Sequence, residues 1–176
     1  MEENLTQEES LIKRIVICGP ESTGKTTMIN NLSVYFQTNY VDEFARDFLQ
    51  KKWDSKKEIC SKEDLIQIAK GQIKAENIKI KNSNKLIFCD TNILTTLAWS
   101  RTHFDEFCDP WLEKQSKLLT YDYYLILNTD IPWVKDDLRD RPKDRKKMFL
   151  AHKKELDNLN VDYDIINGSD FEKRFN

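Results

Sequence analysis

The chain has 176 residues, a formal net charge of -2 and a charged fraction of 33%. This length predicts one domain, residues 1–176, with a substantial core. The slight negative charge excludes general nucleic-acid binding, because such proteins need surplus cations to neutralise phosphates. No apolar run approaches the length that crosses a bilayer, and the acidic start of the chain is unlike a signal peptide. We therefore expect a cytoplasmic protein without membrane insertion.

The first 18 residues contain a polar segment and then a predicted strand. Residues 1–10 are polar and are expected to be frayed. Residues 11–18 are largely apolar and rich in isoleucine and valine, as in a buried strand. Two of the four cysteines, Cys18 and Cys89, end apolar runs and are expected to be small buried hydrophobes. The cysteines form no C-x-x-C pair, which argues against a structural zinc site and suits a reducing compartment.

A glycine-rich loop follows the first strand and matches the pattern G-x-x-x-x-G-K-[ST] at every defined position. Apolar residues then recur at helical spacing to about residue 38. Strand, glycine loop and helix in this order are typical of a P-loop, which binds a nucleoside triphosphate. We expect Lys25 to reach the β- and γ-phosphates and the hydroxyl of Thr26 to bind Mg²⁺. The expected triphosphate-binding residues are Gly19, Glu21, Ser22, Thr23, Gly24, Lys25, Thr26 and Thr27.

The segment after this helix is predicted to contain the second strand and two helices. Residues 39–42 have the position of the second strand in a βαβ unit, and Asp42 and Glu43 follow its apolar part. A helix is expected at 44–49, and the charged run 51–57 predicts a solvated turn. Ser61, with Asp64 three residues later, is typical of a helix start. The apolar spacing after it predicts a long helix to about residue 78.

The remaining chain continues the alternation of strands and helices. Strands are predicted at 86–89, 123–127 and 163–166, and helices after Asp90, from Pro110 and at 146–159. The charged segment 130–147 has no core pattern and is predicted to be a lid. Nearly all-apolar strands that alternate with helices predict a parallel sheet covered on both faces. The expected fold class is α/β, a three-layer sandwich like those of P-loop NTPases and nucleoside kinases.

Acidic residues follow two of the predicted strands, and ligands bind beyond the carboxyl ends of such strands. Asp90 has the Walker-B position, which holds Mg²⁺ directly or through water, although an aspartate there can also cap the next helix. Glu43 can accept a proton from a substrate hydroxyl, or it can pair with Arg46. Both alternatives stay open for Glu43.

The predicted lid offers groups that suit phosphoryl transfer. Arg139 and Arg141 can stabilise the negative charge that develops on the transferred group. Trp133 follows a proline in polar surroundings, so we expect an exposed indole that can stack on a flat ring. Trp99 lies on an apolar helix and is expected in the core.

Four stretches together resemble the ribosylnicotinamide kinase domain of the bacterial NadR family, in order and spacing over nearly the whole chain. They are the P-loop with its following threonine, Glu43-Phe44-Ala45-Arg46, Phe88-Cys89-Asp90-Thr91-Asn92, and the segment from Pro132 to Arg139. The P-loop alone is generic, whereas the P-W-V-x-D-x-L-R pattern is much more specific.

The resemblance implies ATP-dependent phosphorylation of the 5′-hydroxyl of nicotinamide riboside, which yields nicotinamide mononucleotide for NAD synthesis or salvage. It puts Glu43 and Arg46 near the substrate, makes Asp90 the Walker-B acid and sets Trp133 beside the nicotinamide site. Asn92 stands where the family often has a second acid. The helix-turn-helix and adenylyltransferase parts of longer NadR proteins have no counterpart here, so neither DNA binding nor adenylyl transfer is expected.

Two other functions are compatible with a P-loop. One is a regulatory NTPase, although residues 90–93 lack the D-x-x-G pattern of a GTPase and residues 128–130 are not an N-K-x-D base reader. The other is a kinase for another nucleoside or for a nucleoside monophosphate. A monophosphate needs several fixed arginines, whereas a riboside needs carboxylates and amides for its hydroxyls. Asp42, Glu43 and Asn92 favour the riboside.

Overall fold

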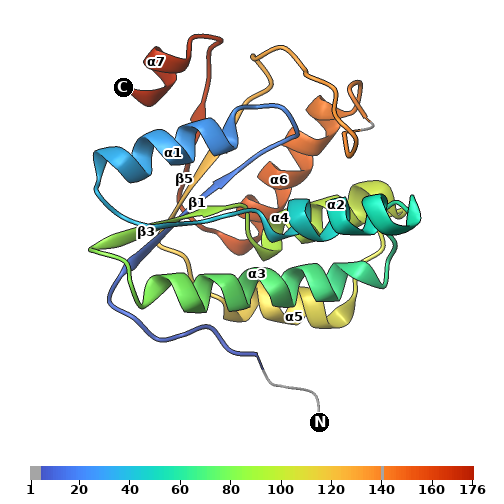
Figure 1. The fold of residues 1–176 in the computed structure, drawn as a ribbon, viewed down its shortest axis with the longest axis horizontal. Coiled ribbons are helices and arrows are strands. Elements are labelled where there is room, and N and C mark those ends of the chain that lie inside the picture. Colours follow the sequence, from blue (N-terminus) through green and yellow to red (C-terminus); the bar gives the residue numbers. More distant parts are fainter. Residues whose placement is uncertain (1–4, 140) are drawn as a thin grey trace.

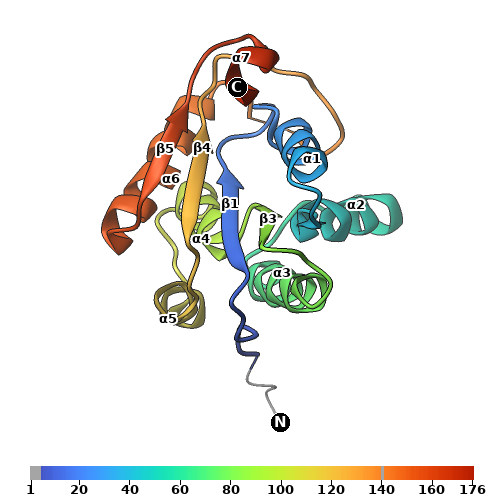
Figure 2. The same cartoon turned by 90° about the vertical axis from the view of Figure 1, so that its left-hand side faces the viewer.

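The computed structural model describes residues 5–139 and 141–176. One sheet of five parallel strands runs in the order β2-β3-β1-β4-β5, which confirms the expected fold class. Figure 2 shows β1 next to β4, and β4 next to β5. The strands are β1 (Lys13–Cys18), β2 (Tyr40–Val41), β3 (Leu86–Asp90), β4 (Tyr123–Leu127) and β5 (Tyr163–Ile166). The helices are α1 (Lys25–Tyr35), α2 (Phe44–Lys56), α3 (Asp64–Ile80), α4 (Ile93–His103), α5 (Pro110–Leu118), α6 (Arg145–Leu159) and α7 (Phe171–Phe175).

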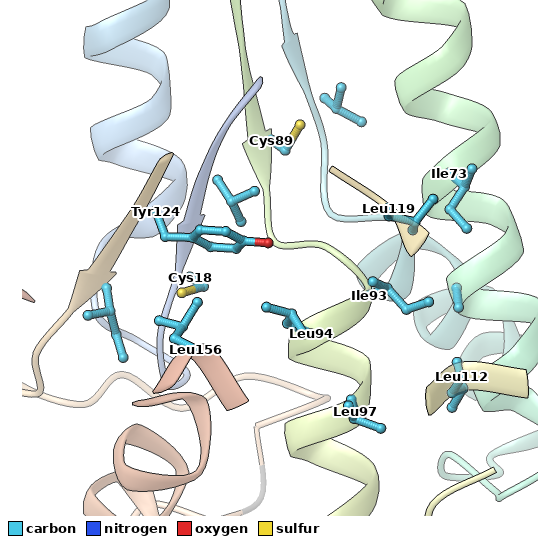
Figure 3. Close-up of a cluster of buried hydrophobic side chains, with 14 of the residues drawn as sticks. Cys18, Ile73, Cys89, Ile93, Leu94, Leu97, Leu112, Leu119, Tyr124 and Leu156 are labelled. Carbon is cyan, nitrogen blue, oxygen red and sulfur yellow. The ribbon is translucent and has the colours of Figure 1, made fainter. Parts of the chain in front are cut away.

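Helices cover both faces of the sheet because the side chains of each strand alternate between two cores. In β1, Val16 and Cys18 join the larger core, which contains buried side chains from α3, α4, α5 and α6 (Figure 3). Ile17 joins the smaller core with Met28 and Ile29 of α1. Figure 1 shows α1 and α7 on one side of the sheet and α3 to α6 on the other. Cys18 and Cys89 are buried in the larger core, as expected.

The predicted solvated turn at residues 51–57 is wrong, because α2 continues through this run to Lys56. The charged residues lie on a helix that contains no fully buried residue, so polar composition here marks a solvated helix. The chain leaves the helix at Lys57, which has a left-handed φ of 56°. By contrast, α1 ends at Tyr35, about one turn earlier than predicted.

The N-terminal segment lies along one edge of the domain. Gln7 donates a hydrogen bond to the carbonyl of Thr120, and the backbone N–H of Glu8 donates to Asn77. Residues 1–4 lie outside the described residues, and the fraying of residues 1–10 stays a prediction. Within the described part of the chain, no helix is both long and apolar enough to cross a bilayer.

Candidate active site

A cavity of about 460 Å³ opens at the carboxyl edge of the sheet and collects the loops that follow β1, β2 and β3. The strand-end rule predicts this location. The predicted site residues in its wall are Gly19, Glu21, Ser22, Thr23, Gly24, Lys25, Thr26, Thr27, Asp42, Glu43, Arg46, Asp90, Asn92 and Arg139. Arg141 and Trp133 are not among the lining residues.

The P-loop joins β1 to α1 and is shaped by backbone constraints. Gly19 has a φ of 132°, and a Cβ at this position would lie 2.6 Å from the carbonyl oxygen of Leu127, so only glycine fits. The ammonium group of Lys25 donates hydrogen bonds to the carbonyls of Gly19 at 3.1 Å and Pro20 at 2.9 Å. Phosphate oxygens are stronger acceptors than these carbonyls, so Lys25 is available to a bound triphosphate.

Two arginines far along the chain hold the P-loop in this shape. Arg145, at the start of α6, donates to the carbonyl of Ser22 at 2.9 Å. Arg174, which is buried in α7, donates to the carbonyl of Thr23 at 2.9 Å. Sequence reasoning missed both residues, because a single arginine in a charged segment carries no pattern that distinguishes an anchor from a solvated side chain.

Asp90 ends β3 and is 3% exposed. Its Oδ2 accepts a hydrogen bond of 2.8 Å from the hydroxyl of Thr26, and its Oδ1 has no hydrogen-bond partner among the described residues. Burial, followed by the nearby charge of Glu43, raises the pKa of Asp90 to about 7. A buried carboxylate oxygen without a partner is costly unless a cation or donor completes it.

This arrangement fits Mg²⁺. The hydroxyl of Thr26 donates a hydrogen bond to Asp90, which leaves a lone pair of the hydroxyl oxygen for a cation, and both residues line the same cavity. No group of three or more His, Cys, Asp or Glu side chains that could hold a metal occurs in the described ranges. Mg²⁺ suits a site with few protein ligands, because substrate phosphates and water supply the others.

Glu43 precedes α2 and is held by contacts of its neighbour Phe44. The backbone N–H of Phe44 donates to Gln72 of α3 at 2.9 Å. The Phe44 ring covers Gly71, where a Cβ would lie 2.1 Å from a ring carbon. The Glu43 side chain makes no capping hydrogen bond to α2 and lines the cavity. Its carboxylate is therefore available to a ligand.

Asn92 lines the cavity with both ends of its amide already engaged. Its Oδ1 caps α4 by accepting the N–H of Leu94 at 3.1 Å, and its Nδ2 donates to the hydroxyl of Tyr124 at 3.1 Å. Asn92 therefore caps α4, so Asp90 does not have the capping role that was considered for it. A direct contact of Asn92 with substrate stays a prediction.

The predicted lid, residues 130–147, overlaps the loop between β4 and α6 and the first turn of α6, and this loop reaches the P-loop. The hydroxyl of Ser22 accepts the N–H of Val134 at 2.9 Å. Arg139 lines the cavity, whereas Arg141 has an Nη1 atom 3.9 Å from Asp144, one turn ahead. The expectation of an exposed indole is wrong, because Trp133 is partly buried and its buried indole N–H has no hydrogen-bond partner among the described residues. The roles of Arg141 and Trp133 stay predictions.

Sequence reasoning missed the remainder of the cavity wall. Trp99, expected in the core, packs against that core, stacks on His103 at 3.8 Å between ring centroids, and also lines the cavity. His152 is 2% exposed, and burial lowers its pKa to about 4. Its Nδ1 lies 2.8 Å from the carbonyl of Met148, so Nδ1 carries the proton and Nε2 is an acceptor. The other lining residues that were not named as site residues are Pro20, Ala45, Asp47, Leu49, Cys60, Leu65, Ile68, Gln72, Thr91, Thr95, Thr96, Leu138 and Met148.

Comparisons with known proteins place the whole domain among P-loop proteins. The model of the AAA_28 family, described as an AAA domain, matches residues 14–174. The trifunctional NAD biosynthesis/regulator protein NadR of Escherichia coli (strain K12) is 26% identical over 166 residues, which are 93% of this chain and 40% of that protein. The chain thus spans less than half of this relative. The predicted resemblance to NadR proteins is confirmed.

Solved structures agree with this assignment of the fold. A NadR protein in complex with NR has a TM-score of 0.78 and 18% identity, and the match covers 92% of this chain and 46% of that chain. The deoxyadenosine kinase of M. mycoides with bound dCTP has a TM-score of 0.59 and 12% identity, over 92% and 94% of the two chains. The backbone therefore resembles those of NadR and of nucleoside kinases.

Proposed function

Because this chain belongs to the AAA_28 family of AAA domains, we propose that it is a kinase that transfers the γ-phosphoryl group of ATP to the 5′-hydroxyl of nicotinamide riboside. The product is nicotinamide mononucleotide, an intermediate of NAD synthesis or salvage. The proposal takes its substrate from the similarity to NadR proteins, one of which was solved with NR. We further infer a single kinase domain in the cytoplasm, which agrees with four free cysteines.

One observation carries the proposal: a single cavity contains the P-loop lysine and the two acidic side chains that follow strands β2 and β3. Lys25 and Thr26 form one wall, and Glu43 and Asp90 face them from β2 and β3. Glu43 caps no helix through its side chain, and Asp90 keeps one oxygen unpaired among the described residues. Phosphoryl transfer needs these groups: a cation for the phosphates, a hydroxyl-orienting base and a metal ligand.

The reaction follows from these roles. The 5′-oxygen of the riboside attacks the γ-phosphorus, the bond from that phosphorus to the β–γ bridging oxygen breaks, and ADP leaves. Glu43 orients the 5′-hydroxyl and accepts its proton, which leaves late in a loose transition state. Lys25 neutralises charge on the β- and γ-phosphates. Arg139 and Arg141 are assigned to the charge that develops on the transferred group.

The metal is assigned to Thr26 and Asp90, because their hydroxyl and carboxylate oxygens suit Mg²⁺ and one Asp90 oxygen is unpaired. When bound, Mg²⁺ neutralises phosphate charge and orients the γ-phosphoryl group. Asp90 is therefore assigned as a metal ligand, and Glu43 as the group that orients the substrate hydroxyl.

The charge of the cavity wall supports a cationic nucleoside. The acids Glu21, Asp42, Glu43, Asp47 and Asp90 outnumber the bases Lys25, Arg46 and Arg139. The pyridinium ring of nicotinamide riboside carries a positive charge, which an acidic wall attracts. We assign the riboside to Asp42, Glu43, Arg46, Asp90 and Asn92, and the ring to an aromatic side chain, for which the sequence favours Trp133.

A nucleoside also fits this wall better than a monophosphate. A monophosphate needs arginines that are free to bind it. Of the two arginines among the lining residues, Arg139 is assigned to the transferred phosphoryl group and Arg46 contacts the carboxylate of Asp136, which leaves neither for the phosphate of a monophosphate.

Release of ADP with ATP, Mg²⁺ and a panel of acceptors tests the proposal. The panel contains nicotinamide riboside, nicotinic acid riboside, the common nucleosides and their monophosphates. We expect the largest kcat/KM for nicotinamide riboside. A larger value for a monophosphate, or ADP release that no acceptor stimulates, would contradict the proposal.

A further inference from the structure

Asp136 lies in the loop between β4 and α6 and uses both carboxylate oxygens. Its Oδ1 accepts the backbone N–H groups of Leu138 and Arg139, each at 3.0 Å, which folds residues 136–139 into a turn. Its Oδ2 accepts a hydrogen bond from Nη2 of Arg46 and lies 3.2 Å from Nε of Arg139. One carboxylate thus binds Arg46 and Arg139, which are 93 residues apart in the sequence.

These two arginines line the cavity and come from different elements. Arg46 projects from the first turn of α2, close after Glu43, whereas Arg139 comes from the loop beyond β4. Two guanidinium groups at one place repel each other, and the carboxylate between them offsets this repulsion. Arg139 has a second anchor, because its Nη1 donates to the carbonyl of Val134 at 2.8 Å.

The charge state of Asp136 agrees with this bridging role. Burial alone raises the pKa of Asp136, but the hydrogen bonds from Arg46 and from the N–H groups of Leu138 and Arg139 outweigh it and lower the pKa. The side chain of Asp136 is 26% exposed, so water screens the pair only in part. Asp136 is therefore ionised at neutral pH and holds both arginines as a charged group.

We propose that Asp136 is a positioning residue of this kinase, which fixes Arg46 and Arg139 and thereby ties the loop 128–139 to α2 across the riboside site. This inference rests on the proposed function. One carboxylate contacts both an arginine of the riboside wall, Arg46, and the phosphoryl-stabilising arginine, Arg139. The loop is joined to the P-loop as well, through Val134 and Ser22.

The test compares Asp136→Asn with the control Asp137→Asn, which removes the same charge from the exposed neighbouring residue. Asparagine keeps an oxygen for the two turn N–H groups but loses the charge that holds the arginines. A displaced catalytic group commonly costs about a hundredfold in rate. We expect kcat/KM for nicotinamide riboside to fall by about tenfold to a hundredfold in Asp136→Asn, with the KM for ATP and the Tm nearly unchanged. Equal effects of the two variants would overturn the inference.

A double-mutant cycle separates positioning from a general structural role. If Asp136 acts through Arg46, then Asp136→Asn should cost much less in an Arg46→Ala background than in the wild-type protein. Losses that multiply in the double variant would show that Asp136 acts independently of Arg46, and would overturn the inference.

Limited digestion with trypsin tests, without any substrate, whether Asp136 holds the loop 128–139 against α2. The loop contains Arg139, and cleavage after this residue requires local opening. We expect Asp136→Asn to be cut after Arg139 several-fold faster than Asp137→Asn. If the wild-type protein phosphorylates no riboside, the proposed function fails and the kinase role of Asp136 fails with it. If the wild-type protein is active but both variants are cut at the wild-type rate, the inference alone fails.

Discussion

At the scale of single residues, the two strand-end acids differ in their surroundings, and this difference predicts their roles. Asp90 is buried, hydrogen-bonded to Thr26 and short of one partner among the described residues. Glu43 stands at the start of α2 with a side chain that caps nothing. Asp90 is thus suited to a fixed cation, and Glu43 to a substrate hydroxyl.

A magnesium titration of the two amide variants checks this division. Asp90→Asn should need far more Mg²⁺ to approach its maximal rate, because a metal ligand has lost its charge. Glu43→Gln should keep the wild-type magnesium dependence and lose turnover or riboside affinity, by a modest factor because the proton leaves late. The opposite pattern would exchange the two roles. A normal rate in Glu43→Gln would leave Glu43 with no catalytic part.

His152 links the cavity wall to the pH dependence of stability. Burial lowers its pKa to about 4 in the folded protein, against 6.5 for an ordinary histidine. Below pH 6.5 the unfolded chain takes up a proton that the folded protein refuses, so this contribution to stability is present above that pH and is lost as the pH falls toward 4. From pH 7 to pH 5 the loss amounts to about 2 kcal/mol.

Urea unfolding of the wild-type protein and of His152→Gln at pH 7, 6 and 5 measures this contribution. The difference in unfolding free energy, wild type minus variant, should decrease with falling pH by the amount given above. The variant is subtracted because burial also raises the pKa of Glu76 and of Asp90. These two acids make the unfolding free energy fall with rising pH, and they do so equally in both proteins. A difference that is constant with pH would mean that His152 titrates normally in the folded protein.

At the scale of elements, two tryptophans compete for the substrate ring. The sequence favours Trp133, because it lies in a polar segment and in the pattern shared with NadR proteins. In the structure, Trp99 of α4 is the one that lines the cavity, with one side of its indole stacked on His103. The same cavity is also lined by the apolar side chains of Leu65 and Ile68.

The affinities of the variants Trp99→Leu and Trp133→Leu for the riboside decide which tryptophan stacks on the substrate ring. Loss of one stacking partner weakens binding by about tenfold to a hundredfold. On the geometry of the cavity we expect this loss in Trp99→Leu, with ATP affinity nearly unchanged. The same loss in Trp133→Leu alone would support the hypothesis made from the sequence. A collapse of the Tm in either variant would assign that indole to the core.

The helices also show where sequence patterns mislead. The charged run after residue 50 is helical in α2, because helix formation there needs only one weakly apolar face and a solvated remainder. The strand β2 has only two residues, yet it places Asp42 and Glu43 at the carboxyl edge as predicted. A strand as short as β2 can be predicted because the order of the neighbouring strands and helices leaves only one place in the chain for it.

At the scale of the whole molecule, the sequence predicts the fold because apolar strands and periodic helices alternate along nearly the entire chain. The strand-end rule then brings the P-loop, Glu43 and Asp90 together without knowledge of any contact. These residues share a position relative to their strands, and such positions can be deduced from the order of elements.

The remaining cavity wall could not be predicted in this way. Ile68, Trp99 and His152 line the cavity from within the helices α3, α4 and α6, so their exposure to it depends on how the helices pack. Arg174 holds the P-loop from the last helix, 151 residues beyond Thr23. Contacts at such separations arise from tertiary packing and have no local sequence pattern.

Identification of the product tests the central claim most directly. The protein is incubated with ATP, Mg²⁺ and nicotinamide riboside, and the products are followed by phosphorus and proton NMR. We predict one nicotinamide mononucleotide for each ADP, with the new phosphate on the 5′-oxygen, and no product from Lys25→Ala, which should remain folded. ADP that accumulates without a phosphorylated riboside, or a phosphate on another hydroxyl, would contradict the account.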